Sequence, residues 1–332
     1  HSIGGVPGNR VTPIVVSIVA STGLKVPKTS SRAITSPSGT ADTMEVFCNV
    51  EFDLGGIKEI VHETGGCMVW GGSVNLSPTD DKIIRAENPL SLDPESQVLA
   101  SVLSKKKSAG STHVVIDIPY GENSKVDDIK EAEDLGEKFK ELGEELGMKV
   151  ECAITRGDQP IGKGIGPNLE AIDVLKVLKG GKPKDLRIKS IRLADMLLKI
   201  CGKKQRAEEI LDTGRALEKF WEIIEAQGGE RTSEEEINVG SFTKVVEAHR
   251  SGHITSIDNK IISNIARRAG APNDVGAGVY LHKKKGNYVE QGDEVFTIYA
   301  EKKEKLKSAM EVFEKRPAFI IKEKDEMLME EL

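Results

Sequence analysis

The chain has 332 residues, of which 38% are hydrophobic and 30% charged, and its formal net charge is -6 at pH 7. This balance is typical of a globular protein with one large or two smaller domains, and it argues against a nucleic-acid polymer as partner. No apolar run approaches the roughly 18 residues of a membrane span, so we expect no membrane partner and a cytoplasmic location.

The four cysteines are widely spaced and form no CxxC pair: Cys48, Cys67, Cys152 and Cys201. This spacing predicts buried thiols in a reducing compartment rather than a disulfide framework or a zinc cluster, and we expect no metal site. A composition rich in Glu and Lys with 4% aromatic residues is typical of a thermophilic source.

A glycine-rich loop opens the chain, with Ser2, Gly5 and Gly8 within the first eight residues. The apolar run after it predicts a helix over 11–24. Glycines let backbone N–H groups point toward one spot, and the positive end of the following helix adds to that field. The loop is therefore a candidate phosphate site. Because the chain begins on His1 rather than on methionine, we expect the natural protein to extend upstream.

A second loop, over residues 29–43, is rich in hydroxyl groups and follows a short predicted strand. It surrounds Arg32, whose planar charged fork matches a phosphate group. A helix is predicted over 40–47 with Thr40 as its N-cap. Two such loops, each ahead of a helix, favour a phosphate or nucleotide site. The alternative is that their Ser and Thr residues only cap helices and solvated turns.

Alternating strands and helices fill the middle of the chain, with strands expected over 67–70, 112–118 and 150–155 and helices over 91–107 and 127–148. This alternation predicts an α/β fold with a doubly wound, mixed or parallel sheet.

The later part of the chain changes character. Residues 169–227 are predicted to be mainly helical, and Gly-Asn and Gly-Asp turns beyond residue 240 predict a small β-rich lobe. Within it, we expect Lys283–Lys285 to form a solvated tip. The expected division is an α/β domain over 1–77 and 110–236, the remnant of a helical lobe over 78–109, and the β-rich C-terminal lobe over 237–332.

The two loops together resemble the signature of the thymidine and pyrimidine-nucleoside phosphorylase family. The family pattern runs Lys-His-Ser-x-Gly-Gly-Val, then a helix, then Ser-x-Arg ending in Gly-Thr-x-Asp-x-x-Glu, and here HSIGGV precedes SSRAITSPSGTADTME. The family lysine would stand immediately before His1. Further along, IIRAENPLSLDPESQVLASVLSKKKSAGSTHVVIDI and ITRGDQPIGKGIGPNLEAIDVL are similar to later family segments. The family architecture is the α/β fold with a helical lobe and a β-rich C-terminal lobe.

Two departures from the family pattern are informative, because RAITSPS replaces a glycine-rich run and PYGENSKV follows the central strand. Both changes are similar to the archaeal branch of the family, which phosphorolyses AMP. The resemblance implies that nucleoside 5′-monophosphates (AMP, and also CMP and UMP) react with inorganic phosphate to give free base and ribose 1,5-bisphosphate. The added hydroxyl groups suit a 5′-phosphate, which needs additional donors.

The resemblance also implies roles for individual residues. Asp93 would be the proton donor, although LSLDPES equally resembles a helix start with Asp93 as N-cap. Inorganic phosphate would contact Ser2, Ser30 and Thr40, and the base would lie near His1, Arg85 and Lys105. Nucleotide contacts are implied at Gly5, Ser31, Arg32, Ala33, Ile34, Thr35, Ser36, Thr40, Ser101 and Lys125.

The expected activity is therefore that of a pentosyltransferase. It would use no cofactor, with inorganic phosphate as co-substrate, and the full-length protein would form a homo-oligomer. Two alternatives stay open at this point. One is a pyrimidine-nucleoside or thymidine phosphorylase, and the other is a nucleotide-binding assembly subunit without catalysis.

Overall fold

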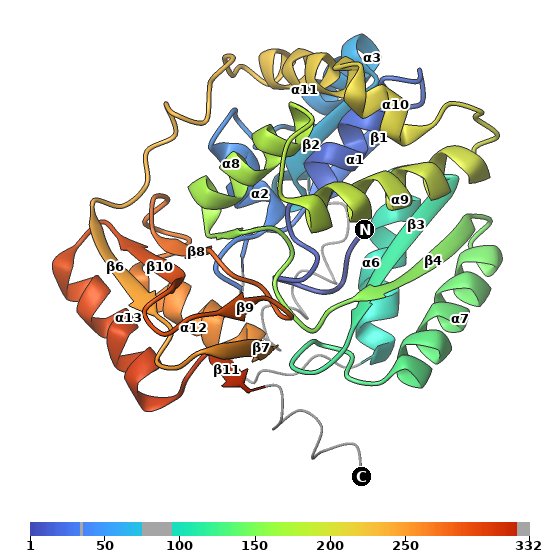
Figure 1. The fold of residues 1–332 in the computed structure, drawn as a ribbon. Coiled ribbons are helices and arrows are strands. Elements are labelled where there is room, and N and C mark those ends of the chain that lie inside the picture. Colours follow the sequence, from blue (N-terminus) through green and yellow to red (C-terminus); the bar gives the residue numbers. More distant parts are fainter. Residues whose placement is uncertain (34–35, 75–94, 324–332) are drawn as a thin grey trace.

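The computed structural model describes residues 1–33, 36–74 and 95–323. Figure 1 shows an α/β part joined to a β-rich C-terminal part. The helices are α1 (Val11–Ala20), α2 (Thr40–Glu45), α3 (Leu54–Thr64), α4 (Gly71–Val74), α6 (Glu95–Ser108), α7 (Ile129–Glu145), α8 (Pro167–Leu178), α9 (Lys184–Ile200), α10 (Ala207–Asp212), α11 (Arg215–Ala226), α12 (Asn259–Ala269) and α13 (Lys303–Lys315). The strands are β1 (Val26–Ser30), β2 (Gly66–Trp70), β3 (His113–Tyr120), β4 (Lys149–Arg156), β5 (Gly164–Ile165), β6 (Phe242–Glu247), β7 (Gly252–Ile257), β8 (Gly278–Leu281), β9 (Tyr288–Val289), β10 (Glu294–Ala300) and β11 (Phe319–Lys322).

Parallel strand pairs form the framework of the α/β part. Strand β1 pairs in parallel with β2, and β3 pairs in parallel with β4. The first residues of the chain lie along the other edge of β3, where the Asp117 N–H donates to His1 O at 2.7 Å and the Ile3 N–H donates to Asp117 O at 3.0 Å. Helices α1 and α3 both pack against β2, and α7 and α9 both pack against β3. The predicted α/β class is confirmed.

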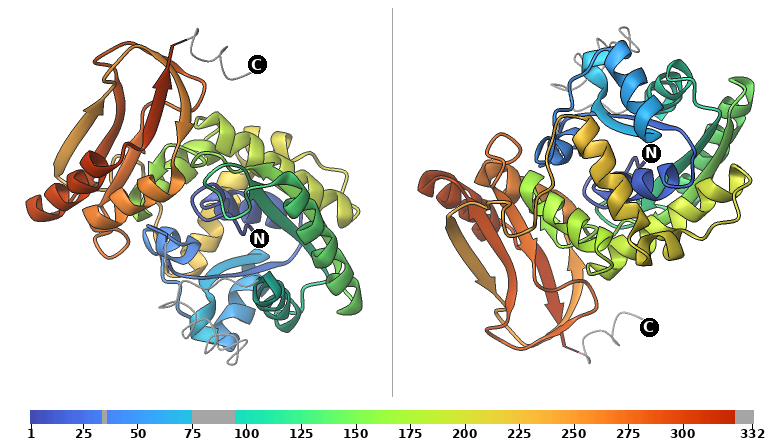
Figure 2. Two further views of the ribbon diagram at one scale, coloured as in Figure 1. Left: turned by 90° about the horizontal axis from the view of Figure 1, so that it is seen from below. Right: turned by 90° about the horizontal axis from the view of Figure 1, so that it is seen from above.

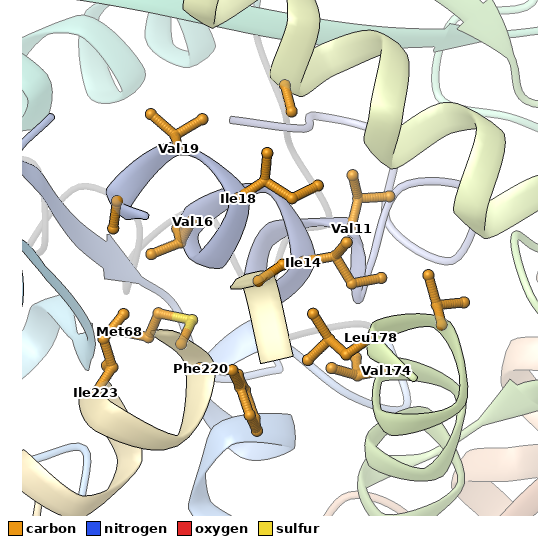
Figure 3. Packing of buried hydrophobic residues seen from close by; sticks show 14 of the residues in the cluster. Val11, Ile14, Val16, Ile18, Val19, Met68, Val174, Leu178, Phe220 and Ile223 are labelled. Atoms are coloured by element: carbon orange, nitrogen blue, oxygen red, sulfur yellow. The ribbon is translucent and has the colours of Figure 1, made fainter. Parts of the chain in front are cut away.

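Helix α1 is at the centre of the main hydrophobic core. Its sequence, VTPIVVSIVA, is apolar on nearly all sides, and such a helix is stable only when it is buried. Figure 3 shows its side chains between Val174 and Leu178 of α8 and Phe220 and Ile223 of α11. The hydroxyl of Ser17, buried inside this core, donates to Pro13 O at 2.7 Å. The glycine-rich loop that precedes α1 is therefore attached to a rigid base.

Two helix boundaries differ from those predicted. Helix α1 ends at Ala20 rather than at residue 24, because Gly23 turns the chain with a φ of 81°. The N-cap of α2 is Gly39, so Thr40 is the first helical residue and not the cap. The carboxylate of Asp42 accepts from the Gly39 N–H at 2.7 Å, and this bond takes over the capping role.

The β-rich part contains two antiparallel sheets, ordered β5–β8–β10–β6 and β11–β7–β9. Figure 2 shows these strands with α12 and α13 at one end of the molecule. Their apolar side chains form a second core, separate from that of α1. Strand β5 comes from the α/β part and pairs with β8, so the sheet joins the two parts. The predicted β-rich lobe is confirmed.

The prediction of a solvated tip at Lys283–Lys285 is wrong. Lys283 pairs with Asp293 at 2.8 Å, and Lys285 pairs with Asp158 at 2.6 Å. Lys284 donates to Gly162 O at 2.7 Å and pairs with Asp185 at 3.1 Å. Three consecutive lysines suggest exposure to solvent when only the sequence is known. The acidic partners of Lys284 and Lys285 cannot be identified at that stage, because they lie far away along the chain.

The structure also shows the environment of the four cysteines and the length of the apolar helices in the described part of the chain. Cys48 and Cys67 are buried, Cys152 and Cys201 are partly buried, and all four are free thiols. Burial raises the pKa of Cys48 and of Cys67 to about 12, so both stay protonated at neutral pH. In the described part of the chain, no helix is both long and apolar enough to cross a membrane.

Candidate functional site

The first loop, residues 2–10, lies against the carboxyl-terminal half of β3 and is packed on itself. A Cβ atom added at Gly8 would lie 1.8 Å from the Ser2 hydroxyl oxygen, so only glycine fits at that position. A Cβ atom at Gly4 would lie 2.2 Å from Cγ of Pro119. The glycines of this loop thus allow close contact between backbone and neighbours, as a tight anion-binding loop requires.

Asp117, in the middle of β3, holds this loop in place. The residue is 1% exposed, and its carboxylate accepts from the Ser2 hydroxyl at 2.6 Å and from the Thr155 hydroxyl at 2.5 Å. The ammonium group of Lys189 lies 2.8 Å from Oδ2 and also donates to Pro7 O at 3.1 Å. Burial lowers the pKa of Lys189, and Asp117 counteracts this shift. Asp117 therefore holds the loop directly at Ser2 and, through Lys189, at Pro7.

The second loop is closed by Asp42 of α2. Oδ2 of Asp42 accepts from the backbone N–H of Ala33 at 2.6 Å and from that of Gly39 at 2.7 Å. A Cβ atom at Gly39 would lie 2.5 Å from Ser31 O, so the two arms of the loop touch through their backbones. The hydroxyl of Ser36 donates to Ser38 O at 2.9 Å. The loop is folded by its own backbone and by one carboxylate.

A direct hydrogen bond joins the two loops, because the Asn9 side-chain amide donates to Ser38 O at 2.6 Å. The contact continues inward, where the hydroxyls of Ser38 and Thr43 lie 3.0 Å apart and Thr43 donates to Glu170 at 3.3 Å. Loops that are separated along the chain by a helix and a strand are thus in direct contact.

Arg10 lies next to this contact between the two loops, in the interior of the protein. It is fully buried, and its guanidinium lies 2.9 Å from Glu170 and 3.8 Å from Asp173. It also donates to Ile161 O. Burial raises the pKa of both acidic partners, and the positive charge of Arg10 acts in the opposite direction. Removal of Arg10 would leave two buried carboxylates without their cation.

Ser30 and Thr40 stand at the two ends of the second loop. The ammonium group of Lys28 donates to the Ser30 hydroxyl at 2.8 Å. Thr40 is the first residue of α2, and the N–H group of the next residue, Ala41, donates to Ser31 O at 3.3 Å. Gly5, in the first loop, adopts a φ of 60°, and a Cβ atom at that position would meet no other atom within 4 Å.

Arg32 has a different environment from the one its sequence context suggests. Its guanidinium pairs with Glu45 at 2.5 Å and Glu51 at 2.7 Å, and it lies 4.8 Å from the ring centroid of Trp70. The pKa of Arg32 is raised, because the hydrogen bonds and charges of the two carboxylates outweigh the opposing effect of burial. In this arrangement Arg32 anchors the start of the second loop to α2.

The other predicted contacts come from separate elements. Ser101 and Lys105 lie one turn apart on α6, and both are partly buried. Lys125 is exposed in the turn that follows β3, where the Gly121 N–H donates to Val126 O at 3.0 Å. The side chain of His1 is exposed, while its backbone pairs with β3.

Four predicted site residues lie outside the described part of the chain: Ile34, Thr35, Arg85 and Asp93. Their roles stay predictions. Within the described residues, no group of three or more His, Cys, Asp or Glu side chains is arranged to hold a metal ion.

Sequence reasoning missed Asp117, Lys189 and Arg10. The signal for Asp117 was an acidic residue inside the apolar run HVVIDI, because a carboxylate in a buried strand needs a partner. Lys189 lies on α9, and the partners of Arg10 lie on α8. No local pattern identifies partners on such distant elements.

The architecture is that of an α/β protein whose glycine- and hydroxyl-rich loops are held together beside parallel strands. Residues 1–217 match the family model described as "Glycosyl transferase family, a/b domain", and residues 253–319 match that of the "Pyrimidine nucleoside phosphorylase C-terminal domain". The chain belongs to this glycosyl transferase family. A solved structure, anthranilate phosphoribosyltransferase (TrpD) from Thermus thermophilus, shares the fold with a TM-score of 0.54 and 16% identity, covering 69% of this chain and 77% of that one.

Curated relatives from archaea are much closer in sequence. An "AMP phosphorylase" of Natronomonas pharaonis is 56% identical over 94% of this chain. Proteins of the same name from Methanococcoides burtonii and Pyrococcus abyssi are 50% and 52% identical over 97% and 93% of the chain. The chain spans 64%, 65% and 63% of the length of these three relatives.

Proposed function

We propose that this protein transfers a 5-phosphoribosyl group from a nucleoside 5′-monophosphate to inorganic phosphate. AMP is the expected substrate, and CMP and UMP are further candidates. The observation that carries the proposal is the hydrogen bond between Asn9 and Ser38, which joins a glycine loop to a hydroxyl-rich loop. Relatives 50–56% identical to this chain are named AMP phosphorylase, and this supports the choice of substrate.

The reaction requires a new bond between a phosphate oxygen and C1′ of the ribose, while the bond between C1′ and the base breaks. The base leaves with the electron pair of that bond and takes up a proton. In this proposal Ser2, Ser30 and Thr40 hold the attacking phosphate, and the loop over residues 31–36 binds the nucleotide. These residues contribute mainly by positioning the two reactants. In intramolecular model reactions, correct positioning of the reacting groups gives large rate increases.

Further residues complete the proposed site. The carboxyl group of Asp93 donates the proton to the departing base. Gly5 and Thr40 contact the nucleotide from the two loops, and Ser101 and Lys125 approach it from α6 and from the turn after β3. His1, Arg85 and Lys105 lie near the base. No cofactor is part of this mechanism, because inorganic phosphate is the second substrate.

The test is phosphate-dependent release of adenine from AMP, measured by chromatography. We expect release only when inorganic phosphate is present. Asp93→Asn should lower kcat by about 10²–10⁴-fold, because a general acid contributes a factor of that order. Asp127→Asn, at an exposed carboxylate ahead of α7, is the matched control and should leave kcat unchanged. If neither this chain nor an upstream-extended chain releases adenine, the proposal is wrong.

A second candidate is a pyrimidine-nucleoside phosphorylase, and the match of residues 253–319 to a pyrimidine nucleoside phosphorylase domain favours it. The two candidates differ in the need for a 5′-phosphate. Uridine and thymidine should react poorly compared with AMP, CMP and UMP under the leading proposal. A reversed order, with uridine or thymidine preferred, would establish the second candidate.

A further inference from the structure

A buried asparagine connects the β-rich part to the turn that carries Lys125. Asn259 is the first residue of α12 and is 3% exposed. Its amide nitrogen donates to Gly157 O at 2.8 Å and to Asn123 O at 3.4 Å. Gly157 follows β4, and Asn123 lies in the turn after β3. One side chain of the β-rich part therefore contacts the chain just beyond the ends of two parallel strands of the α/β part.

The β-rich part holds Asn259 firmly in place. The carboxylate of Asp258 caps α12, accepting from the Lys260 N–H at 2.9 Å and from the Ile261 N–H at 3.0 Å. Ile262, three residues further along the helix, is fully buried in the core of the β-rich part. A side chain at a capped and packed helix end has little freedom, so its hydrogen bonds fix the position of whatever accepts them.

Short-range hydrogen bonds give the turn after β3 its shape. The Gly121 N–H donates to Val126 O at 3.0 Å, and the Ser124 hydroxyl donates to Gly121 O at 2.7 Å. Asn123 adopts a left-handed φ of 64°, which asparagine tolerates better than most residues. Lys125 follows on the exposed side of the turn. These bonds set the shape of the turn, whereas its position relative to β4 depends on contacts with neighbouring residues.

The ends of β3 and β4 are closely packed where Asn259 contacts them. The Gly157 N–H donates to Tyr120 O at 2.7 Å, and a Cβ atom added at Gly157 would lie 2.9 Å from Tyr120 N. A Cβ atom at Gly121 would lie 3.1 Å from Asp158 N. Because the backbones touch, a shift of Gly157 moves the base of the turn as well. The amide of Asn259 therefore acts on the turn at its base and at its middle.

We propose that Asn259 is a positioning residue for nucleotide binding, because its amide holds the turn after β3 so that Lys125 is in place for the nucleotide. Lys125 is the residue of this turn that the proposed function assigns to the nucleotide, and the inference rests on that function. An ammonium group on a flexible stem binds an anion more tightly when its backbone is already ordered, since ordering costs free energy. The β-rich part thus contributes to nucleotide affinity without touching the nucleotide.

Hydrogen exchange followed by mass spectrometry, on the chain without ligand, tests the hold on the turn. Asn259→Ala should accelerate exchange in residues 121–126 by about three- to tenfold, the order expected for the loss of one hydrogen bond. Asn168→Ala is the matched control, because Asn168 is also buried in the first turn of a helix and its amide donates to Asn238 O at 2.6 Å. It should leave exchange in residues 121–126 unchanged. Equal acceleration by both variants, or none by Asn259→Ala, would overturn the proposal.

Titration calorimetry with AMP separates a positioning role from a general effect on stability. Asn259→Ala should weaken AMP binding by about three- to tenfold, and Asn168→Ala should leave it unchanged. Lys125→Ala should weaken it by about tenfold or more, because a charge-assisted hydrogen bond is lost. The double variant Asn259→Ala/Lys125→Ala should bind AMP as weakly as Lys125→Ala alone, because both changes remove the same contact. Additive losses would overturn the proposal.

The outcomes also separate the positioning role from the proposed function. AMP binding that depends on both residues, without release of adenine, would leave the positioning role standing while the proposed function fails. Adenine release with unchanged AMP affinity in Asn259→Ala would overturn the positioning role alone. Wild-type protein that binds no AMP would overturn both. If Asn259→Ala does not fold, Asn259→Ser takes its place, because a hydroxyl has one proton and cannot donate to two carbonyls.

Discussion

At the scale of single residues, Asp117 is the acceptor on which the first loop depends. Its two oxygens take hydrogen bonds from Ser2 and Thr155 and the charge of Lys189, while Lys189 also reaches Pro7 O. The carboxylate and the ammonium group are both nearly inaccessible to water, with 2% and 7% of their side chains exposed. A buried ion pair is sensitive to the loss of one partner, because the other charge is then left unpaired in a medium of low dielectric constant.

We therefore expect Asp117→Asn to lower the free energy of unfolding by about 3–5 kcal/mol, as measured by urea denaturation. The double variant Asp117→Asn/Lys189→Met should recover part of this loss, because it removes the unpaired ammonium group. Glu151→Gln, on the neighbouring strand β4, is the control. Its contact with Lys140 is 3.9 Å long and exposed, so its removal should have little effect. Equal losses for Asp117→Asn and Glu151→Gln would contradict this account.

At the scale of elements, the second loop depends on close contacts between backbone atoms at Gly39, where there is no room for a side chain. The φ of Gly39 is -106°, which any residue adopts, so the requirement for glycine comes from space and not from strain. A Cβ atom there would approach Ser31 O to 2.5 Å, the Arg32 carbonyl carbon to 2.7 Å and Ala33 N to 2.8 Å. These are backbone atoms of the proposed nucleotide loop, and they move only if the loop opens.

Gly39→Ala should accordingly weaken AMP binding by about tenfold or more and lower the free energy of unfolding by about 1–3 kcal/mol, because the loop is overpacked. Titration calorimetry and urea denaturation measure the two effects. Gly136→Ala in α7 is the matched control, because its Cβ atom would meet Cys152 Cβ at an ordinary 3.4 Å. That variant should be more stable by about 0.5–1 kcal/mol, owing to the better helix propensity of alanine. Unchanged AMP affinity in Gly39→Ala would refute the close packing of this loop.

The sequence was most informative about the positions of helices and strands. The apolar run before Ser21 predicted α1, and the β-branched run before Tyr120 predicted β3, because hydrophobic periodicity reports burial directly. The two loops were predicted as parts of a site, but the Asn9–Ser38 bond between them was not, because it depends on how α1 and α2 pack.

Polar partners in the interior were the least predictable part. Arg10 precedes α1, whereas Glu170 and Asp173 lie on α8, in the second half of the chain. Local propensity contains no information on such a pair, and only the tertiary fold brings it together. The roles of Asp93 and Arg85 come from family resemblance, and they stay predictions because both lie outside the described residues.

At the scale of the whole molecule, Lys284 connects the β-rich part to the proposed site. It donates to Pro160 O and Gly162 O and pairs with Asp185, and Asp185 also accepts from the Gly162 N–H at 3.2 Å. The neighbouring backbone N–H groups of Lys163 and Gly164 donate to Asp173, the partner of Arg10. A continuous set of polar contacts thus runs from the segment between β8 and β9 to the base of the first loop.

Lys284→Gln should weaken this attachment by about 1–3 kcal/mol, because a mostly buried charge loses three acceptors at once. Hydrogen exchange followed by mass spectrometry should show faster exchange in residues 157–166 and in β8, with α3 and β2 unchanged. Lys283→Gln is the matched control, because its partner Asp293 lies in the same part of the molecule and the pair is about one-third exposed. That variant should alter exchange only around residue 293. If both variants accelerate exchange at residues 157–166 to the same extent, Lys284 does not join the two parts in the way the contacts indicate.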